Sequence, residues 1–270
     1  APDVPTLPMW FQNDWVHDDL VAEGIVARGA KPLVLGSPHF TDQEAARANL
    51  REYYAEFRRR TPMLGGKPLI DYALDRLKRA SVEQVVVNVH WLPEQVEDWA
   101  QAQGTPEILI SDERDELLET GGGVAKALPL LGEEPFFVLN SDSTWIEGAK
   151  PALERMRDAW RPADMDGLLL VCPTAHTVGY CGQGDFHLDP GGRLVRRAPG
   201  QVAAFVFAGC YLAAPHLFAS HPEGPFSMNV LWDRALAAGR LHGIRHDGLW
   251  LHVGTPDAIG LAERAFSVTG

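Results

Sequence analysis

From about residue 61 onward, runs of apolar, β-branched residues alternate with amphipathic segments of helical period. The segment 83–91, EQVVVNVHW, is a continuous β-branched run of the kind that forms strands buried on both faces. It lies between two segments with helical patterns, 68–80 and 92–104, and the first places Leu74 and Leu77 on one face. Strands that alternate with helices in this way predict a doubly wound, mostly parallel sheet with right-handed crossovers.

The same alternation continues through the middle of the chain. Strands are expected at 106–113, 134–143 and 167–173, and helices are expected after the triple glycine that ends at Gly123 and at 150–160. In doubly wound sheets, ligands bind beyond the carboxyl ends of the strands. The triple glycine and the sequence NSDS at 140–143 each come at or after the end of a predicted strand, so we expect both at a ligand site.

The C-terminal part of the chain has a different pattern. We expect a hairpin at 184–197, a strand and short helix at 203–218, a helix at 227–243, and a strand, turn and helix at 247–266. These elements are interpreted as a small β-rich subdomain at the edge of the main sheet. The predicted fold class is therefore α/β and Rossmann-like, with one domain over 61–270 and an atypical N-terminal segment over 1–60.

The charge balance and the cysteines narrow the range of partners. The chain has 270 residues and a net charge of −12, which argues against a surface that binds nucleic acid or anionic membranes non-specifically. Cys172, Cys181 and Cys210 lack the spacing of a zinc site, and their small odd number fits a reducing compartment. The apolar runs are too short to span a membrane. We therefore expect a cytoplasmic protein.

The most unusual short segment is DELLETGGGV at 115–124. Glycine costs backbone entropy, so a cluster indicates either tight backbone geometry or a ligand that approaches the main chain closely. A flexible loop is the alternative interpretation. The acidic residues beside the cluster, Glu113 among them, fit a solvated face.

The segment FFVLNSDSTW places Asn140 and Asp142 at the carboxyl end of a predicted strand. A carboxylate there is badly placed for a hydrophobic core and well placed to hold Mg²⁺ at a ligand site. A lone aspartate that caps the next turn is the alternative.

Eight motifs in the order of this chain resemble those of the sugar-1-phosphate nucleotidylyltransferases, also called NDP-sugar pyrophosphorylases. The motifs are GGKPLIDYALDRL, VVVNVH, ISDERDELLETGGGV, FFVLNSDSTW, GDFHLDPGGRL, VFAGCYL, FSMNVLWDRA and LHVGTPDA. Within that family the chain is most similar to the N-acetylmuramate-1-phosphate uridylyltransferases. The resemblance covers about three-quarters of the chain, from Pro62 to the C-terminus.

The resemblance implies a reaction of a nucleoside triphosphate, with UTP expected, and a sugar 1-phosphate to give an NDP-sugar and pyrophosphate, in cell-wall recycling. It implies Mg²⁺ as cofactor, held by Asp142 and His252, with Asp142 also catalytic. The implied nucleotide-binding residues are Glu119, Thr120, Gly121, Gly122, Gly123 and Asn140, where bare glycine backbone would accept the base and ribose. The implied sugar-binding residues are Gly179, Tyr180, Asp185, Gly209 and Asn229.

The chain departs from the family pattern in two places. The family's N-terminal Gly-rich loop, close to L-A-A-G-x-G-T-R, does not occur in 1–61, so Lys67 and Arg60 are the expected contacts of the triphosphate. Basic residues at 58–60 also suit the last turn of a helix. The second departure is His252, which stands where many members have a metal-binding aspartate, and Asp247 is an alternative ligand.

Two other functions compete with this one. The missing loop favours a homologue that binds nucleotide or sugar but has lost turnover. A dinucleotide-dependent oxidoreductase would need G-x-G-x-x-G at the start of a βαβ unit with an acidic residue about 20 positions later, and this glycine cluster lacks that spacing.

Overall fold

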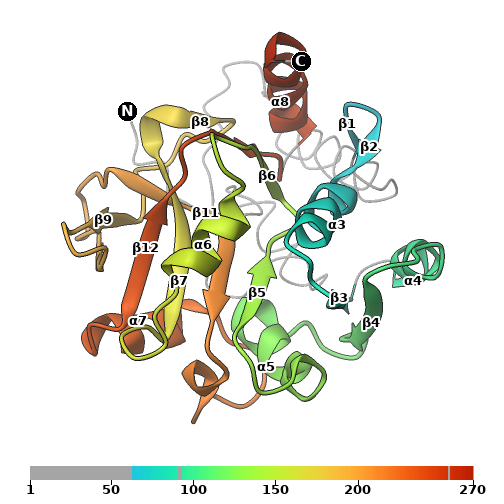
Figure 1. Ribbon diagram of the computed structural model, residues 1–270, viewed down its shortest axis with the longest axis horizontal. Coiled ribbons are helices and arrows are strands. Elements are labelled where there is room, and N and C mark those ends of the chain that lie inside the picture. Colours follow the sequence, from blue (N-terminus) through green and yellow to red (C-terminus); the bar gives the residue numbers. More distant parts are fainter. Residues whose placement is uncertain (1–62, 91–92, 255, 270) are drawn as a thin grey trace, which may run out of the picture.

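The computed structural model describes residues 63–90, 93–254 and 256–269, which form alternating helices and strands (Figure 1). The strands are β1 (Met63–Leu64), β2 (Lys67–Pro68), β3 (Gln84–Val89), β4 (Glu107–Asp112), β5 (Phe136–Leu139), β6 (Ser143–Ile146), β7 (Gly167–Pro173), β8 (Thr177–Val178), β9 (Phe186–Leu188), β10 (Leu194–Arg196), β11 (Phe205–Ala213), β12 (Leu241–Arg245) and β13 (Leu249–His252). The helices are α3 (Leu69–Arg79), α4 (Pro93–Gln101), α5 (Glu119–Leu131), α6 (Ala152–Ala159), α7 (Asn229–Ala237) and α8 (Pro256–Thr269), with short 3-10 turns η1 (Thr174–His176) and η2 (Pro215–Phe218). The predicted α/β class is confirmed.

The main sheet has the strand order β10-β9-β11-β7-β12, and β5 also pairs with β11. Strand directions are more mixed than the alternation of strands and helices predicts. The pairs β3–β4, β7–β12 and β8–β13 are parallel, whereas β11 is antiparallel to β5, β7 and β9. Strand β11 pairs with β5, β7 and β9, so it lies inside the main sheet and not in a subdomain at its edge.

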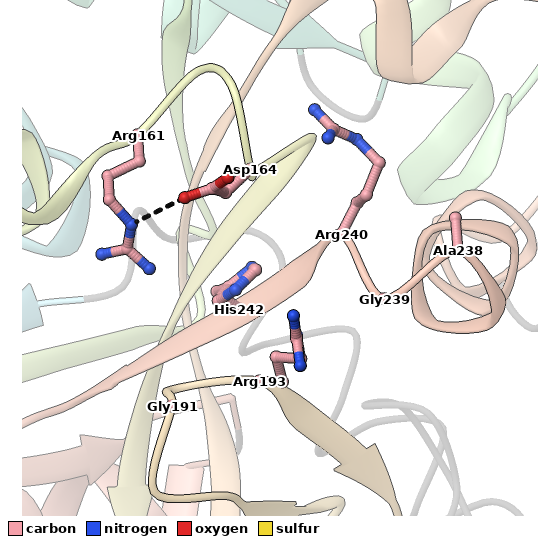
Figure 2. A pocket seen from close by; sticks show the side chains of 8 residues that line it. All are labelled: Arg161, Asp164, Gly191, Arg193, Ala238, Gly239, Arg240 and His242. Carbon is pink, nitrogen blue, oxygen red and sulfur yellow. Dashed lines mark hydrogen bonds and ion pairs between the residues drawn. The ribbon is translucent and has the colours of Figure 1, made fainter.

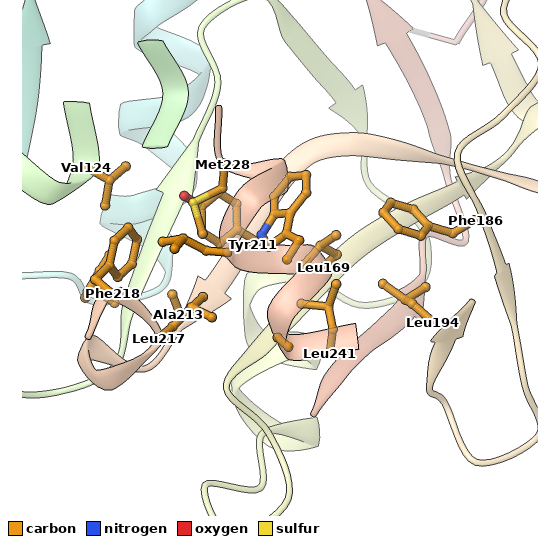
Figure 3. Close-up of a cluster of buried hydrophobic side chains, with 14 of the residues drawn as sticks. Val124, Leu169, Phe186, Leu194, Tyr211, Ala213, Leu217, Phe218, Met228 and Leu241 are labelled. Atoms are coloured by element: carbon orange, nitrogen blue, oxygen red, sulfur yellow. The ribbon is translucent and has the colours of Figure 1, made fainter. Parts of the chain in front are cut away.

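Helices cover both faces of this sheet. Alternate residues of β7 point to opposite sides, and each side packs against a different set of helices. Leu169 and Val171 pack on one side with residues of α5, α7 and η2 (Figure 3). Leu168 and Leu170 pack on the other side with residues of α3 and α6. A smaller cluster joins β1, β13 and α8. The main sheet is therefore held between two packed layers of helices, and this fixes the carboxyl ends of its strands, where a ligand is expected.

The segment 227–243 is not a single helix, and that prediction is wrong. Helix α7 ends at Ala237, Gly239 adopts a positive φ of 66°, and β12 begins at Leu241 and pairs in parallel with β7. The helical pattern stops because Leu241 and His242 are buried consecutively beside β7, which fits a strand and not one helical face.

Within the described ranges, β3 pairs with β4 and β5 pairs with β11, and no strand joins these two groups. The predicted segment 1–60 lies outside the described residues, so its strand and helix stay predictions. None of the described helices combines the length and the apolar character needed to cross a membrane.

Candidate active site

The turn between β5 and β6 carries the first candidate residues. Asn140 follows the last residue of β5, and its N–H donates to the carbonyl of Gly209 on β11 (2.7 Å). Asp142 follows in the same turn, and its carbonyl accepts from the N–H of Val253 (2.9 Å). Both residues therefore lie at the carboxyl end of β5, as the sequence predicts, and backbone bonds from two other segments hold the turn.

His252 lies next to Asp142. A Cβ at Gly254 would be 3.1 Å from the His252 ring and 3.6 Å from the Asp142 Cβ, so the two side chains flank one glycine. Burial raises the pKa of the Asp142 carboxyl, and the imidazole of His252 acts in the opposite direction. The structure thus brings together the two residues that the resemblance assigns to the metal.

Two glycines with positive φ bring the sugar-binding candidates to the same place. At Gly209 (φ 77°) a Cβ would lie 2.0 Å from the Ser143 Oγ and 3.4 Å from the Asn140 Cβ. At Gly179 (φ 78°) a Cβ would lie 2.7 Å from the carbonyl oxygen of His252. Any side chain at either position would displace the turn or the strand that holds Asp142 and His252, so glycine is required at both.

Tyr180 and Asp185 border the same cluster. The Tyr180 ring packs edge-on against Trp250, which in turn stacks on His252. Burial raises the pKa of Tyr180 to about 12, so its hydroxyl is protonated at neutral pH, and it accepts from the N–H of Gly184 (3.0 Å). The Asp185 carboxylate accepts from the N–H of Phe207 (2.8 Å), two residues before Gly209, and burial raises its pKa.

The triple glycine lies in the first turns of α5 and not in a loop. The N–H groups of Gly121 and Gly122 both donate to the carbonyl of Phe226 (2.8 and 3.2 Å). The Thr120 hydroxyl accepts from the N–H of Met228 (2.9 Å), one residue before Asn229. The distant segment 226–228 therefore caps this helix, because the first N–H groups of a helix have no partner within it.

The structure shows a reason for two of these glycines that the sequence did not indicate. A Cβ at Gly121 would lie 2.3 Å from the Phe226 ring, and a Cβ at Gly122 would lie 2.7 Å from the carbonyl oxygen of Gly224. The protein's own chain thus occupies the space beside these two residues. Direct contact of a nucleotide with 119–123 stays a prediction.

Glu113 is a residue that sequence reasoning assigned to a solvated face, yet only 4% of it is exposed. Its carboxylate accepts from the Asn88 amide (2.5 Å) and from the N–H of Leu118 (3.3 Å), and it lies 2.8 Å from a Cβ placed at Gly123. Glu113 therefore positions the start of α5. The sequence signal for this role is that Glu113 directly follows β4 and precedes the glycines.

The remaining candidates lie elsewhere. The Lys67 ammonium forms an ion pair with Asp75 and lies over the Tyr72 ring, 4.8 Å from its centroid. Asp247 pairs with Arg155 (2.7 Å) before β13 begins, at the other end of that strand from His252, and this position favours His252 as the predicted second ligand. Arg60 lies outside the described residues. The Asn229 side chain accepts from Arg196 (3.1 Å) and is exposed.

A scan of family models matches residues 60–177 to the MobA-like NTP transferase domain. The chain is 45% identical to an N-acetylmuramate α-1-phosphate uridylyltransferase of Caulobacter vibrioides over 204 residues, which are 74% of this chain and 84% of that protein. The protein of the same name from Neisseria meningitidis is 34% identical over 197 residues, 71% of this chain and 82% of the other.

Among solved structures, a UDP-glucose pyrophosphorylase complexed with UDP-glucose superposes with a TM-score of 0.62 at 16% identity, over 78% of this chain and 90% of that one. This likeness concerns the fold. The sequence identity to the two bacterial enzymes decides the family, and the chain belongs to the sugar-1-phosphate nucleotidyltransferases.

Proposed function

We propose that this nucleotidyltransferase joins UTP and N-acetylmuramate 1-phosphate to give UDP-N-acetylmuramate and pyrophosphate. The substrates follow the two similar bacterial enzymes. A catalytic role for the chain is supported by the cluster at the carboxyl end of β5. In this cluster Asp142 lies beside His252, and Asn140 adjoins Gly209.

The described residues fit one divalent cation that is shared with the substrate. They hold no group of three or more His, Cys, Asp or Glu side chains suited to a metal. Mg²⁺ keeps several waters and commonly binds one or two carboxylates together with substrate phosphates. Asp142 would supply the carboxylate and His252 a weaker nitrogen ligand. When bound, the ion would neutralise charge on the α-phosphate.

The chain's own residues then have separate roles. The backbone bonds at Asn140 and Asp142 fix the carboxylate before substrate arrives, so little reorganisation is needed. Tyr180 and Asp185 offer a neutral hydroxyl and a carboxylate beside that point, and both suit a sugar's hydroxyl groups. Oriented in this way, the sugar phosphate would attack in line and pyrophosphate would leave.

The direct test is release of pyrophosphate from UTP and N-acetylmuramate 1-phosphate with Mg²⁺. We expect turnover that EDTA abolishes and excess Mg²⁺ restores, with slower reaction when GTP replaces UTP. UTP binding without pyrophosphate release, for this and other sugar 1-phosphates, would instead identify a binding protein that has lost turnover. The pairing of Lys67 with Asp75 gives that outcome a structural basis, because the ammonium is already neutralised.

The sugar-binding role of Asp185 is tested by Asp185→Asn. The amide keeps an oxygen for the Phe207 N–H but loses the charge, so we expect the fold to persist while the KM for the sugar 1-phosphate rises roughly tenfold, as for one lost charged hydrogen bond. The KM for UTP should stay within about twofold. Equal changes in both constants would mean that Asp185 supports the site generally and does not bind the sugar.

A further inference from the structure

A cavity opens at the end of the main sheet opposite Asp142, where β7 and β12 begin. Its volume is about 430 Å³, and it is lined by Arg161, Asp164, Gly191, Arg193, Ala238, Gly239, Arg240 and His242 (Figure 2). Ala213 pairs with both Phe136 and Gly167, so β5 and β7 begin at the same edge and run the same way. Asp142 lies past the far end of β5. The seven residues of β7 separate the two edges by about 20 Å.

The lining of this cavity is cationic although the whole chain is acidic. Figure 2 shows Arg161, Arg193 and Arg240 arranged around His242. Asp164 accepts from Arg161 (3.2 Å) and offsets part of that charge. Arg240 is paired with Asp166 in the same way, so Arg193 is the lining cation that has no carboxylate partner among the described residues.

Two of these arginines differ in how firmly they are held. Arg240 donates to the Asp166 carboxylate (2.6 Å) and to the carbonyls of Ala163 (2.8 Å) and Pro162 (3.3 Å), so its position is fixed. Arg193 sits opposite His242 in an isolated β-bridge. Within the described part of the chain, its guanidinium forms no hydrogen bond or ion pair. All its donors are therefore available to a ligand.

His242 adds a second, independent feature. Only 4% of the residue is exposed, and its Nδ1 has no hydrogen-bond partner. Buried polar atoms in folded proteins are almost always paired, so this unpaired nitrogen is unusual, although it lies beneath the surface of the cavity and does not open into it. Burial lowers the pKa of the imidazole, and the nearby Arg161 and Arg193 act in the same direction.

We propose that this cavity binds a phosphorylated small molecule, with its phosphate between the Arg161 and Arg193 guanidinium groups. Arginine forks match phosphate oxygens in geometry and charge. A volume of about 430 Å³ lies within the usual range of small-molecule sites and leaves room for an organic part beyond the phosphate. The site is distinct from the nucleotidyl-transfer site at the other edge of the sheet.

The test uses glucose 6-phosphate as the probe and glucose as its uncharged control, with binding measured by calorimetry on the full chain. We expect saturable binding of the phosphate only. Arg193→Gln should weaken it at least about tenfold, whereas Arg264→Gln, an exposed arginine on α8, should leave it unchanged. Asp164→Asn should strengthen binding, because Arg161 is then no longer neutralised.

All variants change exposed side chains, and their melting temperatures verify the fold. The affinity for UTP should be the same in Arg193→Gln as in the wild type, which separates this site from the proposed active site. The proposal is overturned if glucose 6-phosphate does not bind, or if Arg193→Gln and Asp164→Asn bind it as the wild type does, because the phosphate would then lie elsewhere.

Discussion

Asp142→Asn is expected to lower the rate of pyrophosphate release by at least about 100-fold, because a metal that neutralises the reacting phosphate supplies several kcal/mol. The substitution keeps the size of the side chain and removes its charge. The backbone bonds that hold the turn do not involve the carboxylate, since the Asp142 carbonyl accepts from Val253. Turnover at saturating UTP and Mg²⁺ is the measurement.

The stability of this variant should change in the opposite direction. Burial raises the pKa of Asp142, which means that burying its ionised form opposes folding, and an amide removes that cost. In EDTA at pH 7, Asp142→Asn should melt at the same temperature as the wild type or higher. The difference in melting temperature should shrink as the pH is lowered, because the wild-type carboxyl becomes protonated at a higher pH than an ordinary aspartate does.

Asp158→Asn provides the matched control, because this exposed carboxylate on α6 pairs with Lys150. We expect it to retain wild-type turnover. Wild-type activity in Asp142→Asn, with a native melting temperature, would remove Asp142 from the mechanism.

The sequence predicted the parts of the site that depend on local pattern. The apolar run before Asn140 and Asp142 indicated a strand that ends at a ligand site, and the structure has β5 there. The turn of the predicted hairpin at 184–197 is also present, with the Gly192 N–H donating to the carbonyl of Asp189 (3.0 Å). Each of these features is specified by residues close together in the chain.

Features that depend on distant contacts could not be predicted in the same way. The burial of His242 depends on β7, some 70 residues earlier in the chain, so the short strand β12 has no local signature. The Glu113 carboxylate accepts from the Asn88 amide on β3, 25 residues earlier, and the pattern around Glu113 does not show this contact. The family's Gly-rich loop does not occur in 1–61, and contact of Arg60 with the triphosphate remains a prediction.

The triple glycine is the clearest of these cases, and it leads to the second large effect. Sequence patterns cannot reveal that the carbonyl of Phe226, about 100 residues later, accepts from the N–H groups of Gly121 and Gly122. A Cβ at Gly122 would lie 2.7 Å from the backbone oxygen of Gly224 and 3.1 Å from the Leu118 Cβ. Backbone atoms cannot rotate away as a flexible side chain can.

Gly122→Val is therefore expected to lower the free energy of unfolding by about 2 kcal/mol, since overpacking a tight contact costs roughly 1–3 kcal/mol and the slightly better helix propensity of valine offsets only a small part of that cost. Urea denaturation measures this loss. Gly104→Val is the control, because a Cβ at Gly104 meets no atom within 4 Å, and its unfolding midpoint should change little. If Gly122→Val instead keeps wild-type stability but loses affinity for UTP, the glycine serves the nucleotide and not the packing of segment 224–226 on α5.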